Sequence, residues 1–192
     1  VELTLDGTRT DIIGEVGNQA FWSTNGVSTQ DQNISLKLGF SAGNRDGNNA
    51  YDPSERYETV VSNPTSSSAS DLEGFGEAPY SIYKDGGWTN GDLTQGVSSK
   101  DFYVAEDTAT FTASSATIDR LKIAAGAGLE LSSANSLTTG AIENEGRLKV
   151  EDNAALVQTS PTDNNSGSGT YEVVNEATYT NQRAFKYWSS PV

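Results

Sequence analysis

Hydrophobic residues alternate with polar ones in short runs along the first half of the chain. The clearest runs are 1–5 (VELTL), 34–40 (ISLKLGF), 57–61 (YETVV) and 80–84 (YSIYK). A period of two turns one side of each run toward a core and predicts a β-strand. No run has a sustained helical period. The pattern predicts an all-β protein whose N-terminal region is antiparallel.

A nine-residue pattern occurs twice in the second half, as LKIAAGAGL at 121–129 and as LKVEDNAAL at 148–156. Three apolar positions recur 27 residues apart: Leu121 as Leu148, Ile123 as Val150, and Leu129 as Leu156. A strand, a turn of small residues and another inward Leu at a fixed period are typical of stacked coils. Phe102 and Val104 resemble an earlier copy, at a spacing of 19.

The repeat predicts a short right-handed parallel β-helix in the C-terminal half. An open stack would expose strand edges, so we expect the N-terminal antiparallel β region to cap or precede it. We assign residues 1–85 to this β-rich region, with a Ser-rich loop at 63–74, and residues 86–192 to the β-helical module. Asn135 and Asn144 fall in turns of the module, where they either form inward polar stacks or serve only as turn residues.

Charge and composition exclude several classes of function. The net charge of −14 repels phosphate backbones and anionic headgroups, so we expect no nucleic-acid partner. No apolar run approaches the roughly 20 residues that span a bilayer, so we expect no membrane insertion. His and Cys are both absent, which removes Ser-His-Asp and Cys-His nucleophile systems and His-ligated zinc. We therefore expect no enzymatic activity, although the 26 acidic residues leave room for a glycosidase-like pair.

The strongest local chemical signal is the sequence NRDGNNAYDPSE at residues 44–55. Oxygen-bearing side chains occupy positions 1, 3, 5, 9 and 12 of this segment: Asn44, Asp46, Asn48, Asp52 and Glu55. That spacing follows the ligand pattern of a twelve-residue calcium loop, so these residues are candidate Ca²⁺ ligands. The alternative is a polar surface loop with chance spacing. Residues 6–11 (DGTRTD) are a weaker version of the same signal, and a hairpin turn explains them as well.

Three tryptophans stand beside turn residues, namely Trp22, Trp88 and Trp188. If their rings are exposed, they would suit stacking against sugar rings. The alternative is that each belongs to a half-buried core.

The order of short elements in the second half is specific in itself. From residue 86 to 192 the chain carries GGWTNGDLTQG, KDFYVAED, IDRLKIAAGAGLEL, ENEGRLKVEDNAALVQ, NNSGSGTYEV and finally YWSSPV. This order resembles a module of large secreted proteins of the Bacteroidota. The resemblance implies export by the type IX secretion system, with the translocon and outer-membrane surface components as partners. It also implies residence in the medium or at the outer cell surface.

Proteins with this module are commonly adhesin-like, so the resemblance implies a non-enzymatic adhesin-like or structural β-helical protein. The alternative is a carbohydrate-binding or polysaccharide-degrading β-helix protein with an extracellular glycan as its ligand. Such chains usually continue past YWSSPV to a C-terminal sorting domain. We therefore expect the signal peptide and the sorting domain to be missing from this sequence, and the stack of coils to be unfinished.

Overall fold

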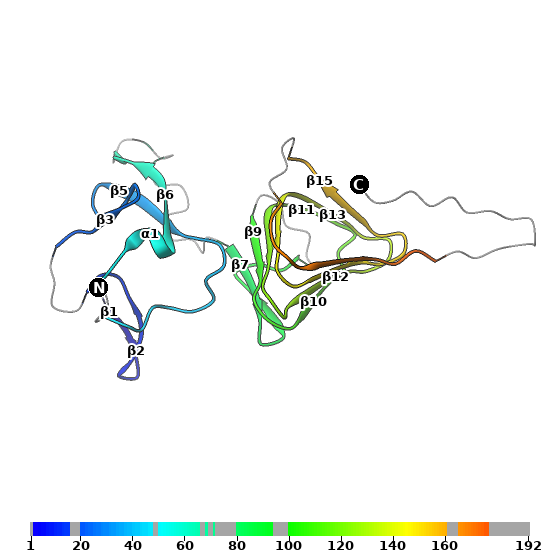
Figure 1. Cartoon of the computed structure of the whole chain (residues 1–192), viewed down its shortest axis with the longest axis horizontal. Coiled ribbons are helices and arrows are strands. Elements are labelled where there is room, and N and C mark those ends of the chain that lie inside the picture. The colour runs from blue at the N-terminus through cyan, green and yellow to red at the C-terminus, as the bar shows by residue number, and fades with distance from the viewer. Residues whose placement is uncertain are drawn as a thin grey trace, which may run out of the picture.

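The structure is a computed structural model that describes residues 2–15, 20–47, 50–65, 68, 71, 80–93, 100–160 and 165–176. It confirms the expected fold class: strands dominate, 4% of the chain is helical, and parallel strands stack as a β-solenoid of about 4 turns. We call the described residues up to 71 the N-terminal unit and those from 80 to 176 the solenoid. The two parts lie side by side along the long axis (Figure 1).

The N-terminal unit contains three two-stranded antiparallel sheets and one helical turn. The sheets pair β1 (Glu2–Leu5) with β2 (Thr8–Ile12), β3 (Ser23–Thr24) with β4 (Val27–Ser28), and β5 (Gln32–Leu36) with β6 (Tyr57–Ser62). The helical turn is α1 (Pro53–Arg56). It escaped the sequence pattern because one turn is too short to show a helical period. Its start is nevertheless encoded, since the Asp52 side chain caps it and Pro53 occupies its first turn.

Two expectations about these strands need correction. Leu3 and Leu5 of β1 do not face a core, because 56% and 67% of their surfaces are exposed. A two-stranded ribbon has no second layer unless other elements cover it. The run 34–40 also stops being a strand at Leu36, and Gly39 after it has a φ of +115°, outside the β region.

The solenoid contains a six-stranded sheet and a four-stranded sheet. The larger sheet has the order β15 (Ala155–Gln158), β13 (Ser136–Asn144), β11 (Ser115–Ile123), β9 (Asp101–Val104), β7 (Tyr80–Lys84), β8 (Gly87–Thr89). The smaller has the order β10 (Thr108–Phe111), β12 (Gly128–Leu131), β14 (Arg147–Val150), β16 (Thr170–Val173). All neighbours are parallel except β7 and β8.

Each complete coil has three faces because the long strands bend. The first halves of β11 and β13 pair with one another, and so do their second halves, with a corner between them. At that corner a Cβ on Gly140 would approach the Asp119 carbonyl oxygen to 2.7 Å, so the close coil contact requires glycine. The third face is formed by β10, β12, β14 and β16.

The register corrects the predicted repeat length. Leu121 lies opposite Phe102, 19 residues earlier, and opposite Ile142, 21 residues later. Leu148 instead lies opposite Leu129, on the third face. The interval of 27 is therefore wrong as a coil length, because it adds one coil to one further face. Every face alternates inward apolar and outward polar residues, so a segment matches its neighbour on the next face almost as well as its true counterpart.

The core of the solenoid is closed at its N-terminal end. Strand β8 pairs antiparallel with β7 and so covers the edge of the six-stranded sheet. Trp88 of β8 packs edge-to-face on Phe102, with ring centroids 5.2 Å apart, and the side chain of Leu93 is completely buried in the same cluster. These contacts shield the first coil from water.

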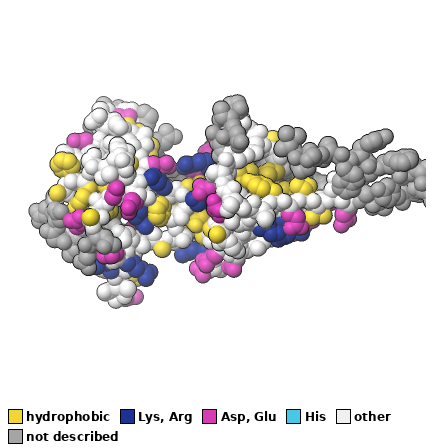
Figure 2. Space-filling model, in the orientation of Figure 1, with side chains coloured by type: hydrophobic (Ala, Val, Ile, Leu, Met, Phe, Trp, Pro, Cys, Tyr) yellow, Lys and Arg dark blue, Asp and Glu magenta, His cyan; other side chains and the backbone are white. Residues whose placement is uncertain are grey.

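The N-terminal unit contacts this closed end through hydrogen bonds and an ion pair. The Tyr80 hydroxyl donates to the Phe40 carbonyl oxygen at 2.6 Å and accepts from the Phe40 amide at 3.2 Å. The Arg120 guanidinium bridges Glu58 of β6 (3.2 Å) and Asp101 of β9 (2.6 Å). Acidic and basic side chains lie next to one another over much of the visible surface (Figure 2).

Candidate functional site

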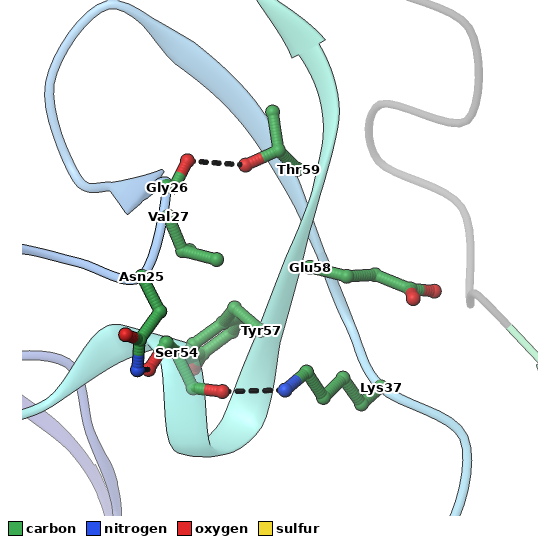
Figure 3. A pocket seen from close by; sticks show the side chains of 8 residues that line it. All are labelled: Asn25, Gly26, Val27, Lys37, Ser54, Tyr57, Glu58 and Thr59. Carbon is green, nitrogen blue, oxygen red and sulfur yellow. Dashed lines mark hydrogen bonds between the residues drawn. The ribbon is translucent and has the colours of Figure 1, made fainter.

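A pocket of about 420 Å³ opens beside α1 in the N-terminal unit. We call it the helix pocket, and Figure 3 shows the eight residues that line it: Asn25, Gly26, Val27, Lys37, Ser54, Tyr57, Glu58 and Thr59. They come from the β3–β4 turn, the end of β5, α1 and β6. The pocket has the size of sites that take small molecules.

Most polar groups around the helix pocket hold one another in place. The Lys37 ammonium donates to the Ser54 carbonyl oxygen at 2.5 Å, and the Asn25 amide donates to the Ser54 hydroxyl at 3.0 Å (Figure 3). The Thr59 hydroxyl donates to the Gly26 carbonyl oxygen at 3.1 Å. Burial raises the pKa of the Tyr57 phenol, so this ring stays neutral. The pocket thus offers pre-oriented hydroxyl, amide and ammonium groups, which suit a polyhydroxylated ligand.

Sequence patterns gave no signal for the helix pocket. Its lining residues are spread from residue 25 to residue 59 and share no motif. Only the pairing of β5 with β6, which brings Lys37 to the carboxyl end of α1, assembles them.

The candidate calcium ligands line a second pocket, of about 400 Å³. Asn44, Asp46, Asp52 and Glu55 all border it, whereas Asn48 lies outside the described residues. The Arg56 side chain borders the same pocket. The structure therefore brings four of the five predicted residues together, but it adds a positive charge that the loop pattern did not anticipate.

Two of these candidates already accept hydrogen bonds. Asp52 Oδ1 accepts from the Ser54 amide at 2.8 Å and from its hydroxyl at 2.7 Å, as the cap of α1. Asn44 Oδ1 accepts from the Asp46 amide at 3.1 Å. Within the described part of the chain, no group of three or more His, Cys, Asp or Glu residues could hold a metal ion. Calcium binding at this loop stays a prediction. Residues 6–11 lie in the β1–β2 hairpin, with Asp6 and Gly7 at its turn.

The two described tryptophans pack against protein groups. The Trp22 ring lies so close to Gly14 that a Cβ there would approach it to 2.7 Å, and it meets the Tyr51 ring edge-on. Trp88 packs on Phe102, as described above. Trp188 lies outside the described residues. The packing of Trp22 and Trp88 fits the half-buried alternative.

Asn135 and Asn144 do more than shape turns, and neither stacks on another asparagine. The Asn144 side chain is fully buried; its Nδ2 donates to the Thr170 carbonyl oxygen of the next coil at 3.0 Å, and its Oδ1 accepts from the Gly146 amide at 3.0 Å. Asn135 Nδ2 donates to the Phe111 carbonyl oxygen of the previous coil at 3.2 Å. Each side chain ties a turn to a neighbouring coil.

Charged residues on the outer faces of the solenoid form ion pairs between adjacent coils. Four such pairs are present: Asp101–Arg120, Lys122–Glu143, Glu130–Lys149 and Arg147–Glu172. A side-chain hydrogen bond from Lys149 lowers the pKa of the Glu151 carboxyl. The hydrogen bond to Asp101 is the main cause that raises the pKa of Arg120. The outer faces therefore carry paired charges that reinforce the coil register.

A family model described as "Domain of unknown function (DUF8693)" matches residues 85–192, which is more than half of the chain. The chain belongs to this family. Its DUF8693 region begins at the turn between β7 and β8 and contains every strand from β8 to β16. No curated protein and no solved structure is significantly similar to the chain. Among the described residues, no helix is long and apolar enough to cross a membrane.

Proposed function

We propose that this chain is a non-enzymatic β-solenoid module of an extracellular or cell-surface protein, with an adhesin-like or structural role. The observation that carries the proposal is the use of charge on the solenoid faces. The carboxylates of Asp101, Glu130, Glu143 and Glu172 are each paired with a Lys or Arg of an adjacent coil. Such pairs keep carboxylates ionised and fix the stacking.

This use of charge differs from what carboxylate catalysis needs. A general acid in a glycosidase has a raised pKa, so that it holds its proton near neutral pH. In the solenoid, hydrogen bonds from Ser168 lower the pKa of Glu145, and the hydrogen bond from Lys149 lowers that of Glu151. Both groups therefore lack the property that an acid catalyst requires, which supports a structural role for these faces.

Export through the type IX secretion system is part of the proposal, and its support is the sequence resemblance over residues 86–192. The partners would then be the secretion translocon and outer-membrane surface components. Fractionation of the producing cells, with antibody labelling of intact cells, tests this route. We expect the protein in the medium or on the outer surface, and its loss from both in a strain that lacks the translocon. Detection only in the cytoplasm or periplasm would contradict the proposal.

Carbohydrate binding is a second candidate function, and the helix pocket favours it. Its ammonium, amide and hydroxyl groups are pre-oriented, which is how protein sites bind polyhydroxylated ligands. A glycan array probed with the wild-type chain and with Lys37→Ala tests this function. Lys84→Ala, which changes a lysine of β7 outside the pocket, is the matched control. A signal lost only in Lys37→Ala supports the function, and no signal for the wild type removes it.

Calcium binding at residues 44–55 is a separate, narrower proposal. Its support is the convergence of Asn44, Asp46, Asp52 and Glu55 on one pocket. Titration calorimetry at about 1 mM Ca²⁺, a weak-site concentration, should give heat with the wild type and much less with Asp46→Asn combined with Glu55→Gln. A wild-type titration without heat would rule the site out.

A further inference from the structure

The two ends of the solenoid differ in how their strand edges are treated. At the N-terminal end, β8 pairs with β7 and Trp88 packs on the first coil. At the other end, β15 and β16 are the last strands of their sheets. Each therefore has one edge without a strand partner in the described part of the chain. Unpaired backbone groups along such edges are templates for another strand.

Apolar rows of the core continue into this end and become exposed there. Leu129, Leu148 and Tyr171 form one row, in which the first two side chains are buried and Tyr171 is 54% exposed. Val150 and Val173 continue the next row, and Val173 is 53% exposed. Figure 2 shows hydrophobic side chains gathered at the end of the solenoid that is far from the N-terminal unit. We call the outer edges of β15 and β16, with Tyr171 and Val173, the open end.

The charges beside these rows indicate what the next strand should carry. Along the outer side of the four-stranded sheet, Glu130, Lys149 and Glu172 follow one another in register, so the sign alternates from coil to coil. The Glu130 and Lys149 side chains are 3.7 Å apart. A strand added beyond β16 would place a residue next to Glu172, and a cation there continues the alternation.

Strand β14 shows which sequence β16 already accepts on its other edge. Its Leu148, Lys149 and Val150 lie opposite Tyr171, Glu172 and Val173. A second copy of the chain is a poorer match. With a net charge of −14, two copies repel each other, and two-fold pairing of β16 centred on Glu172 would place like charges together.

We propose that the open end binds, by strand addition, an extended segment of another polypeptide with the sequence pattern apolar–Lys/Arg–apolar. The two apolar side chains cover Tyr171 and Val173, and the cation pairs with Glu172. Main-chain hydrogen bonds to the edge of β16 provide affinity, and these side chains provide specificity. The inference rests on the proposed adhesin-like function for its biological role. It is tested on purified protein, so failure of docking and failure of export are separate results.

The test uses the full chain and a labelled synthetic peptide that copies residues 145–152, EGRLKVED, with binding followed by fluorescence anisotropy. A second peptide carries Lys149→Glu. We expect the wild-type chain to bind the first peptide about tenfold more tightly than the second, because of the cation beside Glu172. In the Glu172→Lys chain this preference should reverse. Tyr171→Ser should weaken both peptides, and Leu5→Ser, at an exposed Leu of β1, should change neither.

Three outcomes overturn the proposal. The first is no binding of either peptide to the full chain, or equal binding of both. The second is binding that appears only in a chain shortened to residue 176, which would show that residues 177–192 exclude a partner. The third is concentration-dependent dimerisation of the wild type that Tyr171→Ser abolishes, which would assign the open end to a second copy. Circular dichroism of each variant separates these outcomes from loss of folding.

Discussion

The N-terminal unit and the solenoid are both built from short β-strands, yet they are stabilised differently. In the N-terminal unit each sheet has two strands, and side chains such as Leu3 and Leu5 stay exposed. In the solenoid, interior strands pair on both sides and inward side chains form buried rows across the coils. A lone pair of strands is marginal in water, whereas each coil gains stability from its neighbours. The same alternating pattern therefore contributes little or much, depending on whether a second layer covers it.

The largest effect should come from removing a side chain from one of the buried rows. Leu148 is completely buried between Leu129 and Tyr171, so Leu148→Ala should lower the free energy of unfolding by about 2–5 kcal/mol. Leu3→Ala in β1 makes the same chemical change at an exposed position and should change stability by less than about 0.5 kcal/mol. Urea denaturation followed by circular dichroism measures both.

That pair of variants can break the comparison directly. Similar losses in Leu148→Ala and Leu3→Ala would mean that the N-terminal ribbon is covered in solution. The contrast between a layered solenoid and unlayered sheets would then be wrong.

Asn144 tests the polar part of the solenoid core. Asn144→Ala removes the bonds to the Thr170 carbonyl oxygen and the Gly146 amide, and leaves both backbone groups without this partner. We expect a loss of about 1–3 kcal/mol in the free energy of unfolding. Asn135→Ala, which removes one partly buried bond to the Phe111 carbonyl oxygen, should cost less. Equal losses in the two variants would show that burial of Asn144 adds nothing to its hydrogen bonds.

The solenoid could be predicted from sequence because its determinants are local and repeated. Inward positions such as Phe102 and Leu121 alternate with polar ones, so the sequence predicted stacked coils. The coil length was misjudged because all three faces carry this same alternation, and Leu121 was matched to Leu148 on another face. A search at intervals of 19–23 residues, guided by the Phe102–Leu121 pair, would have found the true register.

The N-terminal unit was much less predictable because long-range pairing assembles its pockets. Lys37 meets Ser54 only because β5 pairs with β6 across an intervening loop. The oxygen spacing of residues 44–55 did predict that Asn44 and Glu55 border one pocket. It could not predict that Arg56 borders it too, because ligand spacing takes no account of charges contributed by the following strand.

The N-terminal unit should respond to high pH through its buried phenols. Burial raises the pKa of Tyr51 to about 12, above the ordinary value of 10, because the charged phenolate is poorly solvated there. The neutral phenol therefore favours the folded state. This contribution is fully present below about pH 10 and is lost as the pH rises toward 12, since the unfolded chain ionises first.

Tyr51→Phe should make the fall in stability between about pH 9 and pH 11.5 less steep. The Tyr51 hydroxyl oxygen is buried without a hydrogen-bond partner among the described residues, so the variant should keep its stability at neutral pH. Part of the slope should remain, because burial also raises the pKa of Tyr57 and Tyr80. Urea titrations at the two pH values measure this change. An unchanged slope would show that the Tyr51 ring is solvated in solution.

The smallest effect should appear at one turn position that two successive coils share. Ala134 and Asn153 occupy the turns before β13 and β15, with left-handed φ values of +67° and +61°. Alanine is strained in this conformation, whereas asparagine tolerates it. Ala134→Asn should therefore raise the free energy of unfolding by about 0.5–1 kcal/mol, and Asn153→Ala should lower it by a similar amount. Thermal unfolding followed by circular dichroism measures both. Shifts of the same sign would mean that the two turns differ in backbone conformation and that the coils are less regular than their register indicates.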